Sequence, residues 1–183
     1  TGEVLNSLIA LGARTAGHWQ GAHATPIDAV SQDGAIPLRE DGHGNSANRY
    51  EYKFGITVNT LGQRFYDEGE AKHSYTYAKT GRAVLAQPRG LAYQIFDKKG
   101  YPLFREGNYQ GATLQEAATI AELAKMIGLS PDVLVHTVEA FNAACQDHIP
   151  FEPGIMDGKH TVGITPKKSN WAIKIDAPPY RAY

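Results

Sequence analysis

Residues 55–68 contain an alternating apolar run, then a polar turn and then a cluster of charged residues. This cluster is the part of the sequence that most suggests a chemical role. Alternation around a turn that contains Gly62 predicts a β-hairpin over residues 50–66, whose second strand brings charged groups to one edge. There, Arg64 could hold a carboxylate through charge-assisted hydrogen bonds. We interpret Arg64 and Glu68 as an ion pair that fixes the hairpin rather than as catalysts, and we keep Arg64 as a candidate substrate-binding residue.

A second group of polar residues lies in residues 31–48, a stretch rich in Gly, Asp, Asn and Ser that predicts a long loop. A loop of that length in a compact domain is usually functional or disordered. His43, Asn45 and Arg49 could face a substrate there, because a polar lid loop is a natural recognition element. Loops of this composition are also often merely solvated, so both interpretations stay open for His43 and Arg49.

The composition excludes several classes of function. The 183 residues suffice for one sizeable domain, and the net charge of -1, from 18 basic and 19 acidic residues, indicates no nucleic-acid partner. The single cysteine, Cys145, gives no disulfide framework and no cysteine-rich metal site. No apolar stretch approaches the roughly 20 residues of a membrane helix. We expect a cytoplasmic protein without a membrane segment.

Motifs for cofactors, metals and hydrolysis are missing from the sequence. No Gly-x-Gly-x-x-Gly follows a predicted strand, and the stretch from Gly154 to Lys159 is one residue short of a phosphate-binding loop. The seven histidines show no metal-ligand spacing, and no Gly-x-Ser-x-Gly elbow occurs. We therefore expect neither a metal nor a dinucleotide to bind this chain, and hydrolase or metalloenzyme functions have little support.

Hydrophobic periodicity and turn residues predict the elements that must position these candidates. They predict a helix over residues 3–11 that ends at Gly12 and a further helix within residues 75–85. They also predict a buried strand over residues 91–96 and a partner strand over residues 101–104.

The clearest local pattern is a pair of consecutive helices. Thr119 and Glu122 have the spacing of a capping box, and Gly128 would end that short helix. The Ser-Pro-Asp sequence of residues 130–132 then predicts a second helix start. His136 lies off the apolar stripe of this second helix and should be solvated. The stripe consists of Leu134, Val138, Phe141 and Cys145.

In their order and spacing, several segments resemble the fumarate reductase and succinate dehydrogenase flavoprotein family, and the likeness covers most of the chain. Residues 58–68 are similar to its "V-N-x-x-G-x-R-F-x-x-E" hairpin. Residues 20–25 are similar to its "Q-x-H-P-T" strand, with Ala24 in place of proline. Residues 119–145 resemble a helical pair of the family. The Ser-Asn-Trp-Ala sequence of residues 169–172 looks most like members of the tricarballylate dehydrogenase type.

The resemblance implies the capping domain of a two-domain flavoprotein, an α+β fold with a small mixed or antiparallel sheet and flanking helices. In this family the cap closes over the flavin and holds a small carboxylate substrate. Residues 1–16 would be the helix that leads from the FAD domain, residues 17–177 the capping domain, and residues 178–183 the strand that returns to the FAD domain.

The same resemblance implies what lies outside the chain. The sequence starts at Thr1 without Met, and both ends look cut, so we expect an excised internal domain. FAD would belong to the full-length enzyme, whose FAD-binding domain would be the partner of this cap. We expect the fragment alone to bind no FAD and to be inactive. Residues 31–48 should be mobile without that partner domain.

The resemblance also implies site residues. His23 and Thr25 stand where the family binds a substrate carboxylate, although His23 could instead be a satisfied strand histidine. The family's proton carrier is an arginine eight positions past the one matched by Arg64, which points to Lys72; a one-residue gap would bring His73 there instead. A lysine can relay protons, because its pKa falls readily on burial. Alternatively, Lys72 and His73 lie on a solvated helix start.

From this resemblance we expect the substrate cap of an FAD-dependent oxidoreductase that acts on a CH–CH bond of a small polycarboxylate. Tricarballylate-like acids come first, and succinate- or fumarate-like acids next. Two alternatives stay open. One is the cap of a 3-ketosteroid dehydrogenase-type flavoenzyme, in which an apolar pocket would replace the carboxylate site. The other is a free-standing, non-catalytic module that binds small acids.

Overall fold

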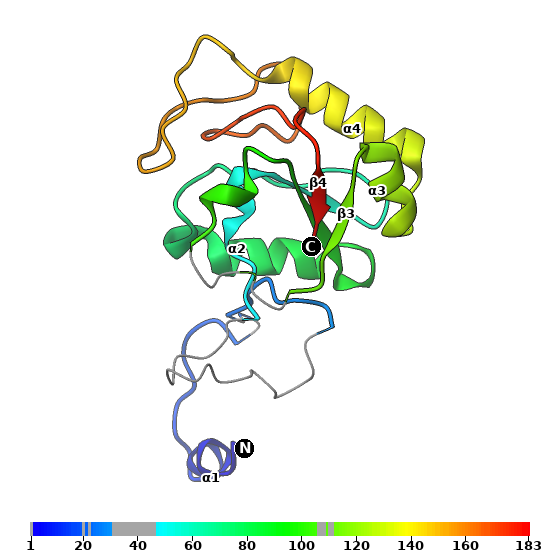
Figure 1. Ribbon diagram of the computed structural model, residues 1–183. Helices are drawn as coiled ribbons and strands as arrows, with labels where there is room; N and C mark the ends of the chain where they lie inside the picture. The colour runs from blue at the N-terminus through cyan, green and yellow to red at the C-terminus, as the bar shows by residue number, and fades with distance from the viewer. Residues whose placement is uncertain (1, 20, 22, 31–46, 106–108, 110–111) are drawn as a thin grey trace.

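A four-stranded sheet forms the middle of the computed structural model, which describes residues 2–19, 21, 23–30, 47–105, 109 and 112–183 (Figure 1). The spatial order of its strands is β1-β2-β4-β3, and each neighbouring pair is antiparallel. The sheet and its flanking helices confirm the predicted α+β fold. The strands are β1 (Ile56–Asn59), β2 (Ala92–Phe96), β3 (Gln115–Ala117) and β4 (Tyr180–Ala182).

Helices α3 (Ile120–Met126) and α4 (Pro131–Ala144) cover one face of the sheet. The predicted capping box is confirmed, because the amide of Glu122 donates to Thr119 Oγ1 and the amide of Thr119 donates to Glu122 Oε2, both at 3.1 Å. Ser130 is the N-cap of α4, but its side chain makes no capping hydrogen bond. The predicted stripe of α4 is buried and His136 is exposed, as expected. Each large apolar side chain buried there stabilises the fold by about 1.5–3 kcal/mol.

Helix α2 (His73–Leu85) lies against the other face of the sheet, below the strands in the view of Figure 1. Successive strand side chains point to opposite faces. Accordingly, Ile56 and Val58 belong to the core beneath α3 and α4, whereas Thr57 faces a cavity that it shares with Val84 of α2. The sequence predicts this helix within residues 75–85, and the structure begins it two residues earlier.

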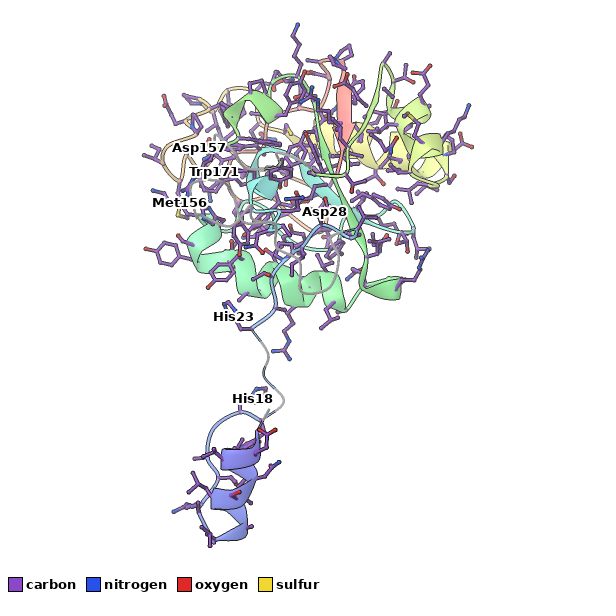
Figure 2. The ribbon with its side chains drawn as sticks, turned by 60° about the horizontal axis from the view of Figure 1, so that its bottom comes forward. His18, His23, Asp28, Met156, Asp157 and Trp171 are labelled. Carbon is purple, nitrogen blue, oxygen red and sulfur yellow. The ribbon has the colours of Figure 1, made fainter. Side chains whose placement is uncertain are left out.

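Helix α1 (Glu3–Ala10) lies apart from the body of the molecule (Figures 1 and 2). It agrees with the predicted helix over residues 3–11 to within one residue, and Gly12 follows with a φ of 91°. None of its residues is buried, so its apolar side chains find no core. No described helix is both long and apolar enough to cross a membrane.

The predicted hairpin over residues 50–66 is only partly right. Glu51–Phe54 form a short 3-10 helix, η1, and the return segment pairs with β1 only through one bridge, between Val58 and Arg64. A longer ladder does not form here, because Glu68 Oε1 accepts the amide N–H of Thr57 at 2.8 Å and so takes the donor that a second strand would use.

The partner strand predicted over residues 101–104 is wrong. Tyr101–Leu103 form the 3-10 helix η3, in which Pro102 has no amide hydrogen to give to a strand ladder. The buried Asp97 carboxylate instead accepts the amides of Lys99 and Gly100 through Oδ1, and those of residues 176–177 through Oδ2. These bonds lead the chain into β4, which occupies the place beside β2.

Candidate functional site

Lys72 and His73 stand at the start of α2, and Ser169 and Asn170 hold the turn before them. Asp67 accepts the hydroxyl of Ser169 at 2.5 Å and its amide at 2.9 Å. The side-chain amide of Asn170 donates to the carbonyl oxygen of Gly69 at 2.8 Å. A Cβ at position 69 would lie 2.7 Å from the backbone nitrogen of Asn170 and closer still to its carbonyl oxygen, so only glycine fits. The position from which Lys72 projects is therefore set by tertiary contacts.

Two tyrosines connect His73 with His23. The rings of His73 and Tyr50 are stacked, with centres 5.3 Å apart and an interplanar angle of 11°. The ring of Tyr77 lies 5.5 Å from that of Tyr50, and its hydroxyl is 2.8 Å from His23 Nε2. Figure 2 shows His23 on the segment that leaves the body beside α2. The structure thus brings three of the predicted residues, His23, Lys72 and His73, to one end of α2.

Thr25 lies at the edge of the same group. Its hydroxyl donates to Asn48 Oδ1 at 3.3 Å. Burial raises the pKa of the Tyr50 phenol above its usual range, and the nearby Tyr77 adds to that rise, although a hydrogen bond with Thr25 opposes it. Tyr50 is therefore a neutral phenol at physiological pH, which can give a proton to a hydrogen bond but carries no charge.

Positive charge gathers around His73. Burial lowers the pKa of its imidazole below the usual range, and the charge of Arg105 lowers it further, as does that of Lys53, against an opposing effect of Glu51. His73 is therefore mostly neutral near pH 7 and can accept a proton. Glu51 is buried, and its Oε1 accepts the amide of Arg105 at 3.5 Å. This end of α2 carries positive charge that can neutralise an anion, and the neutral imidazole of His73 beside it can accept a proton.

Arg64 makes its contacts elsewhere. Its Nε donates to Glu68 Oε1 at 3.0 Å and its Nη2 to Glu68 Oε2 at 2.5 Å, which confirms the predicted ion pair. Its Nη1 donates to the carbonyl oxygen of Pro166 at 2.8 Å. Beside this pair, Lys168 is fully buried, with Nζ 2.5 Å from the carbonyl oxygen of Gly55, and burial lowers its pKa to about 8. These contacts hold β1 and the return segment together and give no support for Arg64 as a substrate ligand.

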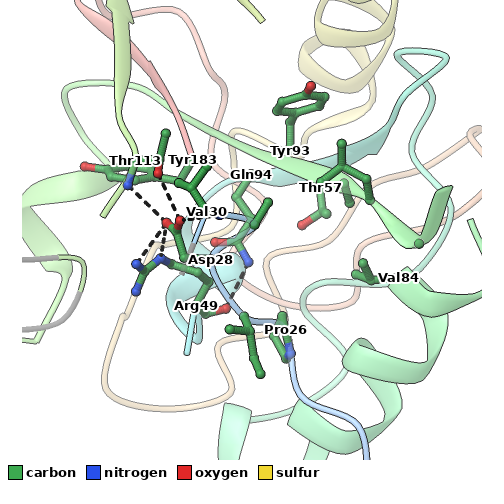
Figure 3. A pocket seen from close by; sticks show the side chains of 15 residues that line it. Pro26, Asp28, Val30, Arg49, Thr57, Val84, Tyr93, Gln94, Thr113 and Tyr183 are labelled. Atoms are coloured by element: carbon green, nitrogen blue, oxygen red, sulfur yellow. Dashed lines mark hydrogen bonds and ion pairs between the residues drawn. The ribbon is translucent and has the colours of Figure 1, made fainter. Parts of the chain in front are cut away.

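Arg49 also has a structural partner. Its Nε and Nη2 donate to Asp28 Oδ2 at 3.1 and 2.9 Å, and the same carboxylate accepts the amide and hydroxyl of Thr113 at 3.0 and 2.9 Å. This cluster ties the segment that carries His23 and Thr25 to the body (Figure 3). The assignment of Arg49 to substrate stays a prediction. His43 and nearly all of the predicted loop over residues 31–48 lie outside the described residues.

A cavity of about 190 Å³ lies under this segment, beside the Asp28–Arg49 pair (Figure 3). Its walls are mainly apolar and include Pro26, Val84 and Tyr93. It is smaller than the roughly 300–1,000 Å³ of typical small-molecule sites, so we place the candidate site at the start of α2 instead. Among the described residues, no three His, Cys, Asp or Glu side chains gather to hold a metal.

Sequence reasoning missed four members of the candidate site: Tyr50, Lys53, Tyr77 and Arg105. The prediction of a strand through residues 50–54 hid the first two, because a strand would have turned them to opposite faces. The available signal was the Tyr-Glu-Tyr-Lys-Phe sequence of residues 50–54, where charged and aromatic residues alternate.

Comparison with known proteins finds solved structures of similar fold, each at low sequence identity. No protein-family model matches the chain, and no curated protein sequence matches it either. A solved 3-ketosteroid Δ1-dehydrogenase from Sterolibacterium denitrificans, in complex with 1,4-androstadiene-3,17-dione, is similar in fold with a TM-score of 0.61 and 23% identity. The match covers 100% of this chain and 34% of that one.

Two further solved structures share the fold. The open conformation of a flavocytochrome c3 fumarate reductase has a TM-score of 0.55 and 20% identity, over 90% of this chain and 24% of that one. A 3-ketosteroid-Δ4-(5α)-dehydrogenase from Rhodococcus jostii RHA1, in complex with 4-androstene-3,17-dione, has a TM-score of 0.50 and 24% identity, over 73% of this chain and 25% of that one. The chain therefore spans about a quarter to a third of these proteins and corresponds in fold to one part of them.

Proposed function

We propose that this chain is the substrate-capping domain of an FAD-dependent oxidoreductase that dehydrogenates or reduces a small polycarboxylate, with tricarballylate-like acids as the first candidates. The observation that carries the proposal is the connected series His23–Tyr77–Tyr50–His73, which ends beside Lys72. On this proposal, His23 would be the carboxylate partner and Lys72 or His73 the proton carrier of one surface. The fold that the chain shares with parts of a fumarate reductase and of steroid dehydrogenases supports a cap of this kind.

The residues of this chain would bind and transfer protons rather than carry electrons. His23 and Thr25 would bind one substrate carboxylate, and Lys72 or His73 would move a proton to or from the carbon that reacts. His73 suits a base, because its lowered pKa keeps it neutral near pH 7. The sequence has no glycine-rich dinucleotide motif. A separate domain would hold the flavin and supply the hydride chemistry.

The domain boundaries follow from the same proposal. Residues 1–16, with the separate helix α1, would lead from the FAD domain, and residues 17–177 would form the cap. Residues 178–183 would return to the FAD domain. Within them, β4 pairs with both β2 and β3, so the connection would pass through the sheet of the cap.

A 3-ketosteroid dehydrogenase-type cap remains the second candidate, because the match to the Sterolibacterium enzyme extends over the whole chain. A steroid would need an extended apolar pocket. Near His73 there are instead three cationic side chains, Lys53, Lys72 and Arg105, and such a group suits a polyanion. This difference in charge is why the carboxylate proposal comes first.

The test compares substrates on the purified full-length protein. Under anaerobic conditions, we expect tricarballylate to bleach the oxidised flavin absorbance, and 3-ketosteroids to leave it unchanged. Bleaching by a 3-ketosteroid alone would establish the second candidate. A full-length protein that binds small acids but no flavin would instead be a non-catalytic binding module. The 183-residue chain alone should stay colourless after incubation with FAD.

A further inference from the structure

Lys53 lies in η1 with its ammonium over two aromatic rings. Its Nζ is 4.5 Å from the ring centre of Phe54 and 5.0 Å from that of Trp171. The side chain is half-buried, yet among the described residues its Nζ has no hydrogen-bond or ion-pair partner. Ring faces attract a cation without using its N–H donors, so all three donors of Lys53 remain available.

The ring beneath Lys53 is held in an unusual backbone conformation. Trp171 is fully buried and has a φ of 53°, a left-handed value that bulky residues rarely adopt. Its amide donates to Asp157 Oδ1 at 2.9 Å, and its indole N–H donates to the carbonyl oxygen of Glu152 at 3.2 Å. Figure 2 shows Trp171 and Asp157 side by side. Strain of this kind persists where the surroundings hold it, and it is concentrated at functional sites.

Like charges surround Lys53. Lys72 and Arg105 are close enough to lower the pKa of its ammonium, in addition to the larger effect of burial and against the charge of Glu51. In the described part of the chain, the side chains of Lys72 and Arg105 also lack an ion-pair partner. Three cations around one buried carboxylate repel one another, and an anion bound between them would relieve that repulsion.

We propose that Lys53 binds a second carboxylate of the substrate and thereby gives the site its preference for acids with three carboxylates over acids with two. The inference rests on the proposed carboxylate substrate. His23 would hold one carboxylate. It is linked to His73 through Tyr77 and Tyr50, and the charge of Lys53 acts on His73. A compact ammonium with three donors suits a carboxylate on a flexible acid. Trp171 is the positioning residue that holds Lys53 in place.

The test measures binding to the purified chain by NMR, with tricarballylate and succinate as probes. In the wild-type chain, we expect tricarballylate to shift the indole N–H signal of Trp171. Lys53→Met should weaken tricarballylate binding about tenfold or more, the loss expected for a charge-assisted hydrogen bond, and change succinate binding less than about twofold. Lys53→Arg should recover part of the loss. Lys125→Met removes an exposed lysine on α3 and is the matched control.

Equal tricarballylate binding by wild type and Lys53→Met would overturn the inference. If Lys53→Met does not fold, the titration of the wild-type chain still tests the inference. An indole N–H signal of Trp171 that does not shift when tricarballylate is added would contradict a carboxylate bound to Lys53. The flavin experiment on the full-length protein is independent of both. If tricarballylate binding depends on Lys53 but the flavin is not bleached, the oxidoreductase function is refuted and the acid-binding site stands. If the flavin is bleached but Lys53→Met has no effect on binding, the oxidoreductase function stands and the role of Lys53 is refuted.

Discussion

The imidazole of His73 lies face to face with the phenol ring of Tyr50, 5.3 Å from centre to centre. This contact joins the start of α2 to η1, two segments that the sequence separates by the whole of β1 and the charged turn after it. It also constrains the plane of the imidazole, with an interplanar angle of 11°. As the base that we propose, His73 would lose little freedom on binding a substrate.

Removing one hydroxyl from the histidine–tyrosine series should weaken substrate binding more than turnover. Tyr77→Phe deletes the partner of His23 Nε2 but keeps the ring packing on Tyr50. We expect a KM for tricarballylate several-fold higher in the full-length enzyme and a kcat within about twofold, because a bond that orients a binding group acts before the chemical step. Tyr75→Phe, on the exposed side of the same helix, is the control. A kcat loss at constant KM would argue against this role.

A single methyl group at position 69 should disturb the turn that carries Lys72. Gly69→Ala forces a Cβ against the backbone of Asn170, and a backbone neighbour cannot move aside as a flexible side chain can. We expect a loss of about 2–3 kcal/mol in unfolding free energy, or roughly 4–12 °C in Tm. Gly154→Ala meets nothing within 4 Å and should leave Tm nearly unchanged. Equal Tm values for the two variants would show that the contact with Asn170 does not matter.

The Asp28–Arg49 pair should make stability depend on acid pH. Burial alone would raise the pKa of Asp28, but hydrogen bonds from Arg49 and Thr113 outweigh it, and the net pKa is lowered. A carboxyl group whose folded pKa is lowered stabilises the fold above its unfolded pKa of about 3.9 and loses that effect as pH falls through the folded value. Asp28→Asn should cost roughly 3 kcal/mol at pH 7 and almost nothing below both pKa values. Thermal unfolding of both proteins between pH 7 and pH 2 measures this, and a constant difference in Tm would contradict it.

Elements with complete local signals could be predicted from the sequence. The capping box at Thr119 and the apolar stripe of α4 require only neighbours within a turn or two, so both appear as predicted. The predictions failed where the structure of a segment is determined by a side chain that lies far away in the sequence. Asp97 leads residues 176–177 toward β2, so β4 rather than residues 101–104 fills that place in the sheet. Glu68 captures the amide of Thr57 and limits the hairpin to one bridge.

The candidate site could be predicted only in part for the same reason. The family resemblance pointed to His23, Lys72 and His73. Their local sequence, however, does not predict that His23 lies near the other two in the folded chain. Their meeting depends on Tyr50 and Tyr77, whose ring contacts link residues as far apart as 54 positions. Lys53 was missed because its significance lies in its surroundings, the ring of Trp171 and the nearby positive charges, rather than in its neighbours along the chain.

We propose that the start of α2 supplies the proton carrier of a flavin-dependent reaction on a carboxylate substrate. The most direct measurement is the rate of anaerobic flavin reduction by tricarballylate in the full-length enzyme at pH 7, for wild type, Lys72→Met and His73→Ala. We expect one of the two variants to lose about 10²–10⁴-fold in rate, as the removal of a general acid or base does, while its flavin spectrum stays normal. A strong loss in His73→Ala alone would assign the role to His73. Wild-type rates in both variants would contradict the account.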